Sequence, residues 1–230
     1  MANEQFFFSQ HIEGDVIHLE RDEHHHLSHV LRKKPGDTVL VSDGKGMLYQ
    51  TGIIDIRQDV TRCRITDTYP LAGEPGNKVS LAVGMIKAAH WEILLEKAVE
   101  LGVYEIYPLI TRYTLMSAIK RERCEKIILS AVKQCGRSRI PELHEPLPFS
   151  DLVAREHKTP VYICDNQDDH PPLPATEKPE DALILVGPEG GFHPDEIRRA
   201  LDAGAKPVLL ANRRLRTETA CMLALSRLVV

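Results

Sequence analysis

The chain has 230 residues, of which 43% are hydrophobic and 27% are charged, and its formal net charge is −4. This length allows one large domain or two modest ones, and the composition is that of a globular protein with a sizeable core. The negative charge excludes a uniformly basic coat for nucleic acid but leaves room for local basic patches.

The sequence contains no apolar run of the length that crosses a membrane, and Met1–Gln10 does not have the pattern of a secretory signal. We therefore expect no membrane segment and no leader. The five cysteines are scattered and form no CxxC pair, so neither a disulfide framework nor a zinc site is expected. A reducing, cytoplasmic environment fits this cysteine usage best.

Up to about Tyr69 the apolar segments are short and are separated by turn residues, which is typical of a small β-barrel. A helix is expected at Asp22–Arg32, because Leu27, Val30 and Leu31 recur at helical spacing. The expected strands are Asp15–Leu19, Thr38–Ser42, Met47–Ile56 and Val60–Thr68.

A linker rich in Gly, Pro and Asn follows at Leu71–Asn77 and separates a first domain, residues 1–72, from a second, residues 73–230. In the second domain, almost wholly apolar strands alternate with helices, which predicts an α/β fold with a parallel sheet covered on both faces. The expected strands are Val79–Gly84, Val103–Ile110, Val161–Cys164, Leu183–Val186 and Val208–Leu210. The expected helices are Trp91–Leu101, Ile127–Cys135, Pro194–Ala203 and Thr217–Leu228.

A glycine-rich loop, Gly187–Gly191, directly follows the strand at Leu183–Val186 and precedes a helix that begins at Pro194. Glycine lets a backbone approach a ligand closely, and α/β folds bind ligands at the carboxyl edge of the sheet. Asp195 and Glu196 in the first helical turn disfavour a phosphate, and no phosphate-loop motif is present. The loop predicts a neutral or cationic ligand, the alternative being a connection that binds nothing.

Three arginines precede the last helix. Arg213, Arg214 and Arg216 stand just before Thr217, whose hydroxyl is expected to cap the helix. Guanidinium groups match phosphate oxygens, whereas cations at a helix N-terminus oppose the helix dipole. The pattern favours an anionic partner, and the alternative is a helix end with no binding role.

A second basic stretch, from Arg112 to Arg139, has eight Lys or Arg and two Glu. It ends at a helix terminus marked by Gly136, where Gln134 and Arg137 can bond bases or phosphates. The alternative is a Gly-capped helix end whose basic residues favour the dipole.

Four histidines lie between His24 and His29. His25 and His29, at positions i and i+4 of the expected helix, have the spacing of two metal ligands. No Cys lies near them and no HExxH pattern is present, so we expect a polar helix edge and no metal site.

Five segments, taken together and in order, resemble the RsmE-type ribosomal RNA methyltransferases of the SPOUT superfamily. They are His25-His26-Leu27…Val30-Leu31-Arg32, Glu96–Val103, Gln134–Arg137, Gly187–Gly191 and Leu215–Ala220. The resemblance covers nearly the whole chain. It implies an RNA-binding PUA-like β-barrel over residues 1–72 and a SPOUT methyltransferase domain over 73–230, an α/β parallel sheet with a C-terminal trefoil knot.

The resemblance also implies an activity: methylation of N3 of a uridine in small-subunit (16S) ribosomal RNA, with S-adenosylmethionine as the methyl donor. The implied partners are this RNA or the 30S particle, and a second copy of the chain in a homodimer. The cofactor is expected among the loops after Val186 and Leu210. The cofactor-binding residues are expected to be Leu185, Gly187, Gly190, Gly191, Leu210, Leu215 and Ala220.

The same resemblance suggests residues for catalysis and RNA binding. Glu218 is the first candidate for the base that removes the N3 proton, and Glu189 is the second. Arg216 is expected to stabilise the charge that develops on a uracil oxygen. The RNA-binding residues are expected to be Arg32, Lys87, Gln134, Arg137, Arg139 and Arg213.

Two residues of the last loop depart from the family pattern, which usually has Gly where Ala211 stands and an apolar residue where Arg214 stands. A side chain at position 211 restricts φ, and Arg214 adds charge beside a pocket expected to be mostly apolar. Two alternatives therefore stay open. One is a SPOUT methyltransferase that acts on another RNA position, on ribose, on another base or in transfer RNA; the other is a non-catalytic RNA-binding or ribosome-assembly protein.

Overall fold

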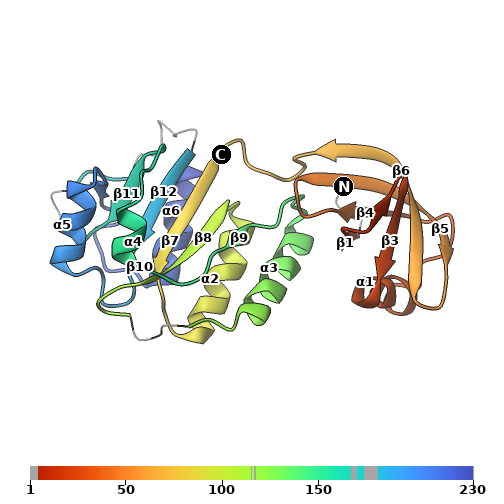
Figure 1. The fold of residues 1–230 in the computed structure, drawn as a ribbon, viewed down its shortest axis with the longest axis horizontal. Coiled ribbons are helices and arrows are strands. Elements are labelled where there is room, and N and C mark those ends of the chain that lie inside the picture. The colour runs from red at the N-terminus through yellow and green to blue at the C-terminus, as the bar shows by residue number, and fades with distance from the viewer. Residues whose placement is uncertain (1–4, 115, 117, 167–169, 174–180, 230) are drawn as a thin grey trace. The chain divides into compact units, whose positions relative to one another are not determined.

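The computed structural model describes residues 5–114, 116, 118–166, 170–173 and 181–229. The chain forms two compact units (Figure 1). The first comprises Met1–Glu74 and Val132–Ile140, and the second comprises Pro75–Ala131 and Pro141–Val230. The change of unit after Glu74 lies inside the expected linker. The return of residues 132–140 to the first unit is an addition to the continuous domains expected from the sequence.

The first unit is built on a six-stranded sheet with the order β1-β4-β5-β6-β3-β2. β1 is parallel to β4 and the other neighbours are antiparallel, so the expected β-barrel is present as a half-barrel. Its strands are β1 (Phe6–Phe8), β2 (Ile12–Glu13), β3 (Val16–Glu20), β4 (Thr38–Ser42), β5 (Met47–Ile56) and β6 (Val60–Pro70). Inward-facing apolar side chains make its core: Phe7, Ile17, Leu19, Leu27, Val39, Val41, Ile53 and Cys63.

The expected helix at Asp22–Arg32 is two short elements, α1 (Arg21–His25) and the π-helix η1 (His26–Val30). The wider π turn is closed by a hydrogen bond from the Leu31 N–H to the His26 carbonyl, 2.9 Å long. Leu27 is fully buried, whereas Val30 is 60% exposed. Val30, although at helical spacing from Leu27, therefore does not share its buried face, because the π turn changes that spacing.

The second unit contains a seven-stranded sheet in which every pairing is parallel. The order is β10-β8-β7-β12-β11-β13, and β9 also pairs with β8. The strands are β7 (Lys78–Gly84), β8 (Glu105–Ile110), β9 (Glu142–Leu143), β10 (Leu147–Pro148), β11 (Val161–Cys164), β12 (Asp181–Val186) and β13 (Lys206–Val208). The parallel α/β sheet expected from the alternation of strands and helices is confirmed.

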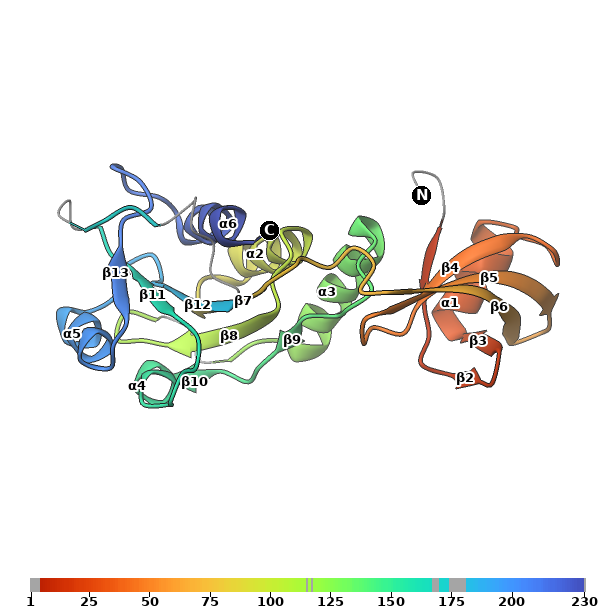
Figure 2. The same ribbon diagram turned by 90° about the horizontal axis from the view of Figure 1, so that it is seen from above.

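Helices cover both faces of this sheet, as Figure 2 shows, with α2 and α6 on one side and α4 and α5 on the other. The helices are α2 (Ala88–Glu100), α3 (Arg121–Cys135), α4 (Phe149–Val153), α5 (Pro194–Asp202) and α6 (Thr217–Leu228). The expected apolar face of α2 is buried, and Gly102 ends that helix with a φ of +85°. No described helix is long and apolar enough to cross a membrane.

The last strand is displaced from its expected position. β13 ends at Val208, two residues earlier than expected, although its neighbour Leu209 still donates a backbone hydrogen bond to the Pro171 carbonyl. Leu210 therefore lies outside the sheet, in the loop that leads to α6. The carboxyl ends of β11, β12 and β13 then lie side by side, because these three strands are adjacent and parallel.

Candidate active site

A cavity of about 200 Å³ lies at the carboxyl edge of the second unit's sheet. Its walls come from the ends of β11 and β12, from the two loops that follow β12 and β13, and from the start of α6. This is the edge at which open α/β sheets bind ligands. The lining residues are Cys164, Asp165, Asn166, Val186, Gly187, Pro188, Glu189, Gly190, Gly191, Phe192, Leu210, Arg214, Leu215, Thr217 and Ala220.

A hydrogen bond joins the two loops on either side of the cavity. The Thr217 hydroxyl donates to the Gly187 carbonyl over 3.1 Å. Thr217 was expected to cap α6 with this hydroxyl, but the N-cap position belongs to Arg216 and has no side-chain cap. The hydroxyl therefore links the loops rather than the first turn of the helix, so that expectation was wrong.

Gly187 and Gly191 of the first loop are required to be glycine for different structural reasons. A Cβ on Gly187 would lie 2.8 Å from the carbonyl carbon of Gly191, so the loop closes tightly only with glycine there. Gly191 has a φ of +73°, and a Cβ there would meet no atom within 4 Å. The Gly191 N–H donates to the Pro188 carbonyl over 2.8 Å, which closes the turn. Gly191 thus presents bare backbone to open space at the cavity.

The loop also rests on the neighbouring strand. A Cβ on Gly84, at the end of β7, would lie 2.6 Å from the Pro188 nitrogen and closer still to its ring. Because all of β12 pairs with β7, up to Val186 opposite Val83, this contact holds the start of the loop against the end of β7.

The N-terminus of α5 is occupied by the chain's own acids. His193 is the N-cap and its side chain accepts from the Asp195 N–H, with Pro194 following in the first helical turn, as expected. The Glu196 carboxylate accepts the His193 N–H at 2.8 Å and the Arg112 N–H at 2.9 Å. These contacts leave little attraction for a phosphate at this helix end.

Six of the seven residues expected to bind a cofactor line the cavity: Gly187, Gly190, Gly191, Leu210, Leu215 and Ala220. Leu185 does not. Its side chain is fully buried and packs in the core with Phe149 and Ile163. It lies one residue before Val186, which does line the cavity, so the structure does not bring its side chain together with the other six.

The sequence reasoning missed Cys164, Asp165 and Asn166, which line the cavity from the end of β11. Burial, and secondarily the neighbouring Asp165 carboxylate, raises the pKa of the Cys164 thiol far above its ordinary value. The thiol is therefore protonated at neutral pH and is a poor nucleophile. Asp165 in turn lies 3.1 Å from a ring nitrogen of His170.

The three residues expected to act in catalysis lie near the same edge. Glu189 lines the cavity and is exposed. The Glu218 carboxylate is only 12% exposed and lies 2.9 Å from Nδ1 of His90, at the start of α2. Arg216 is exposed at the N-cap of α6. Glu218 and Arg216 are not among the residues that line the cavity itself.

Four of the residues expected to bind RNA are exposed: Arg32, Lys87, Gln134 and Arg213. Arg137 is not, since its side chain is 3% exposed and forms an ion pair with Glu74 at 2.7 Å. Its charge is therefore paired inside the first unit, which does not favour the expected contact of Arg137 with RNA. Arg139 is partly buried, and its N–H donates to the same Glu74 carboxylate.

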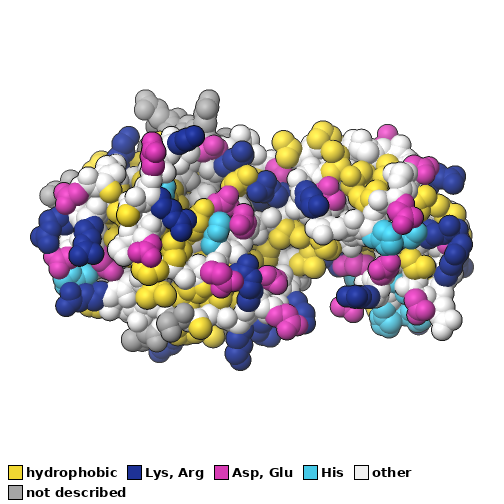
Figure 3. All heavy atoms as spheres, in the orientation of Figure 1, with side chains coloured by type: hydrophobic (Ala, Val, Ile, Leu, Met, Phe, Trp, Pro, Cys, Tyr) yellow, Lys and Arg dark blue, Asp and Glu magenta, His cyan; other side chains and the backbone are white. Residues whose placement is uncertain are grey.

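The remaining surface charge is mixed. On the face drawn in Figure 3, Lys and Arg side chains of each unit are interspersed with Asp and Glu side chains. The described residues of this face therefore form no continuous basic coat.

The chain thus combines an α/β sheet, with a cavity between two loops at its carboxyl edge, and a separate unit that contains a β half-barrel. Family models agree with both parts: an RNA methyltransferase domain matches residues 73–229, and an RNA methyltransferase PUA domain matches residues 19–60. By class, the chain is an RNA methyltransferase.

Similarity to known proteins shows to which family of RNA methyltransferases the chain belongs. The chain is 32% identical over 161 residues to ribosomal RNA small subunit methyltransferase E of Mesomycoplasma hyopneumoniae, covering 68% of this chain and 71% of that relative. It is 31% identical over 212 residues to the enzyme of the same name from Synechocystis sp., covering 89% and 69%. A crystal structure of that enzyme from Neisseria gonorrhoeae, bound to S-adenosyl methionine, matches with a TM-score of 0.88 at 26% identity, covering 97% and 96%. The chain belongs to the ribosomal RNA small subunit methyltransferase E family.

Proposed function

We propose that the chain transfers a methyl group from S-adenosylmethionine to N3 of a uridine in small-subunit (16S) ribosomal RNA. The observation that carries the proposal is that the Gly187–Gly191 loop and the Leu210–Thr217 loop line one and the same cavity. The hydrogen bond from Thr217 to Gly187 makes these loops one structure. Family membership and the cofactor-bound relative support the same reading.

The residues of the cavity fit this cofactor. Leu210, Leu215 and Ala220 offer apolar contacts, and Gly191 offers backbone at a point where no side chain intrudes. Asp165 and Glu189 place carboxylates beside a ligand that carries a sulfonium and an ammonium group. The cavity is smaller than the roughly 300–1,000 Å³ of drug-sized sites, so we expect part of the cofactor to extend beyond its mouth.

Arg214, one of the two residues of the last loop that depart from the family pattern, also lines this cavity. Its guanidinium can pair with the cofactor's carboxylate, which would turn an apparent mismatch into a contact. Ala211 is not among the lining residues that the structure describes.

Bound S-adenosylmethionine supplies an electrophilic methyl group, so the chain mainly has to align the uracil and remove its N3 proton. Glu218 is the proposed acceptor of that proton. Its low exposure and its bond to His90 hold the carboxylate in one orientation at the start of α6. A positioned base of this kind contributes about 10²–10⁴-fold. Glu189 is the second candidate, and Arg216 is proposed to stabilise negative charge on a uracil oxygen.

Substrate RNA is proposed to contact Arg32 and Gln134 of the first unit and Lys87 and Arg213 of the second, with Arg139 in a secondary role. These exposed side chains can reach phosphates or base edges without breaking a buried ion pair. Family resemblance further supports a C-terminal trefoil knot, a homodimer and a cytoplasmic location. Light scattering coupled to gel filtration tests the dimer.

The activity is tested by incubating the protein with S-adenosylmethionine labelled in its methyl group and with either 30S particles or naked 16S RNA. The RNA is then digested to nucleosides and analysed by mass spectrometry. We expect label in 3-methyluridine. Label in a ribose-methylated nucleoside, or only in transfer RNA offered in parallel, would instead identify a related methyltransferase with another target. RNA binding without any transfer would identify a non-catalytic protein.

A further inference from the structure

The β2–β3 hairpin of the first unit gathers imidazole and carboxylate groups on one face. β2 and β3 pair antiparallel with Ile12 opposite Ile17, and the His18 N–H donates to the His11 carbonyl over 2.9 Å. His11 therefore lies directly opposite His18, and their rings stack with centroids 4.3 Å apart and planes 16° apart. Glu13, two residues after His11, emerges on the same face, because side chains of a strand alternate.

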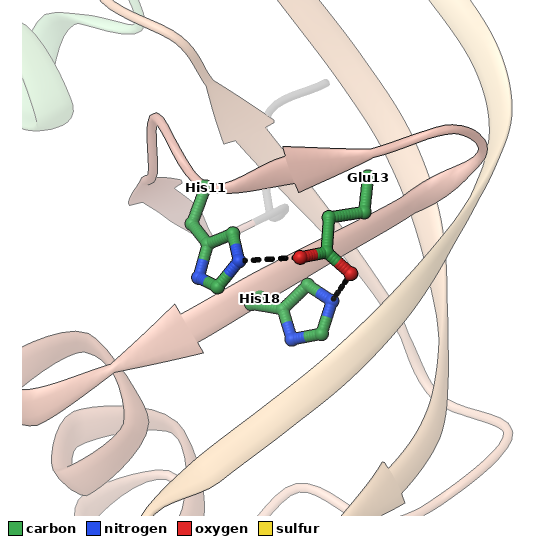
Figure 4. A group of neighbouring side chains, drawn as sticks. All are labelled: His11, Glu13 and His18. Atoms are coloured by element: carbon green, nitrogen blue, oxygen red, sulfur yellow. Dashed lines mark hydrogen bonds and ion pairs between the residues drawn. The ribbon is translucent and has the colours of Figure 1, made fainter.

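Figure 4 shows how these three side chains converge: both imidazole rings point toward the Glu13 carboxylate. Nε2 of His11 lies 3.1 Å from one carboxylate oxygen, and Nε2 of His18 lies 3.7 Å from the other. One ligand atom from each residue lies within 4.8 Å of the other two. Zinc–ligand bonds of 2.0–2.2 Å place neighbouring ligands of a tetrahedral ion roughly 3.3 Å apart. The two measured separations lie on either side of that value.

A fourth residue, Glu20, contacts His11 through the other ring nitrogen. Nδ1 of His11 lies 2.9 Å from a carboxylate oxygen of Glu20, at the end of β3. A carboxylate accepts, so this contact requires a proton on Nδ1 and leaves Nε2, the nitrogen that faces Glu13, as the one that can bind a metal ion after losing any proton of its own. A carboxylate that orients a histidine in this way is the usual second layer of a protein metal site.

We propose that His11, Glu13 and His18 form a binding site for a divalent transition-metal ion of the zinc type, with Glu20 orienting His11. Two imidazoles and one carboxylate suit such an ion better than magnesium or calcium, which prefer oxygen ligands alone. The sequence led to no expectation of a metal here, because the pairing of Ile12 with Ile17 is what brings His11 and His18 together. A bound ion would join β2, only two residues long, to β3 at the edge of the half-barrel's sheet.

Another histidine pair provides a matched control. His25 and His29 are exposed in the same unit, and their ring centroids are 4.9 Å apart in a stacked arrangement. Among the described residues, no third metal ligand lies close enough to join these two histidines in a metal site. Replacing both with Asn removes as many imidazoles as the site itself contains. This variant separates a specific site from general binding by histidine-rich surface.

The test is calorimetric titration of the metal-free full-length protein with zinc chloride, and separately with magnesium chloride. We expect one zinc ion per chain and no heat from magnesium. Glu20→Gln should weaken zinc binding by about 10–100-fold, the usual effect of losing an orienting carboxylate. His18→Asn should weaken it at least as much, and the His25→Asn/His29→Asn variant should bind as the parent does.

Circular dichroism of each variant checks that the half-barrel is folded before the affinities are compared. Absence of zinc binding would overturn the proposal. So would binding that survives His18→Asn, or that is lost only in the His25→Asn/His29→Asn variant.

Discussion

The buried ion pair between Arg137 and Glu74 tests how the first unit is held together. The two side chains are 3% and 7% exposed, and Nη2 of Arg137 lies 2.7 Å from the carboxylate. The Arg137 Nε–H also donates toward both carboxylate oxygens, at 3.3 and 3.2 Å. The same carboxylate accepts the Arg139 N–H at 2.8 Å. The pair therefore joins the linker to the returning segment 132–140 within the unit.

Replacing Arg137 with Met removes the guanidinium and leaves the Glu74 carboxylate buried with one backbone donor. Breaking a buried pair in this way typically costs about 3–5 kcal/mol, because the remaining charge loses its partner in a medium of low polarity. We expect a loss of this size in the free energy of unfolding, measured by urea denaturation followed by circular dichroism. Lys126→Met, which breaks a pair that is 75% and 85% exposed, should change it by less than about 1 kcal/mol.

The double variant Arg137→Met/Glu74→Met decides whether the mechanism is the unpaired charge. Apolar replacement of both partners often costs little, so we expect the double variant to be more stable than Arg137→Met alone. Strictly additive costs would refute the reasoning. At temperatures where the variants are folded, the salt dependence of RNA binding should be unchanged, because a guanidinium buried against Glu74 releases no counterions. A shallower slope of log affinity against log salt in the Arg137 variant would instead show that Arg137 contacts RNA phosphates.

Three further changes probe the second unit. Gly84→Ala drives a methyl group into Pro188, so calorimetry should show weaker S-adenosylmethionine binding. Gly52→Ala is the control, because a Cβ there meets no atom within 4 Å, and it should leave the affinity unchanged. Equal affinities of the two variants would mean that the position of the loop is unimportant for binding. Glu218→Gln should lower kcat by at least about 10²-fold in the methyl-transfer assay while the cofactor Kd is retained, and an undiminished kcat would exclude this carboxylate as the base. Arg213→Ala should reduce the slope of log affinity against log salt by about 1 in filter binding, and an unchanged slope would contradict a phosphate contact.

Elements with strong local patterns were predictable from the sequence. The expected strands at Thr38–Ser42, Met47–Ile56 and Val161–Cys164 coincide with β4, β5 and β11, and the expected helix at Thr217–Leu228 coincides with α6. β4 and β11 contain short apolar runs, β5 follows the turn residues Asp43–Gly46, and α6 has apolar residues at helical spacing. None of these patterns needs knowledge of the rest of the chain.

Elements defined by their partners were not predictable. β2, β9 and β10 have two residues each, too few to show any periodicity. β1 exists because Phe6–Phe8 lie parallel to β4, more than thirty residues further along the chain. Such pairings depend on tertiary structure, which overrides weak local preference.

The site divides in the same way. The Gly187–Gly191 loop could be found because glycines follow a buried strand at the ligand-binding edge. The contribution of Asp165 could not, since it depends on β11 lying beside β12 and β13, and strand order is not a local property. The burial of Arg137 was missed because its partner Glu74 is 63 residues away.

The central claim, that the two loops enclose S-adenosylmethionine through bare backbone at Gly191, is tested most directly by one pair of variants. Gly191 and Gly204 both have left-handed φ values, +73° and +90°, and a Cβ on either meets no atom within 4 Å. Only Gly191 lines the cavity, so the strain of adding Val is matched and the position relative to the cofactor differs.

Calorimetric titration of the folded variants with S-adenosylmethionine then gives a clear comparison. We expect Gly191→Val to show no detectable binding and Gly204→Val to bind as the parent does. Binding retained by Gly191→Val, or lost equally in both variants, would contradict a cofactor held between these loops.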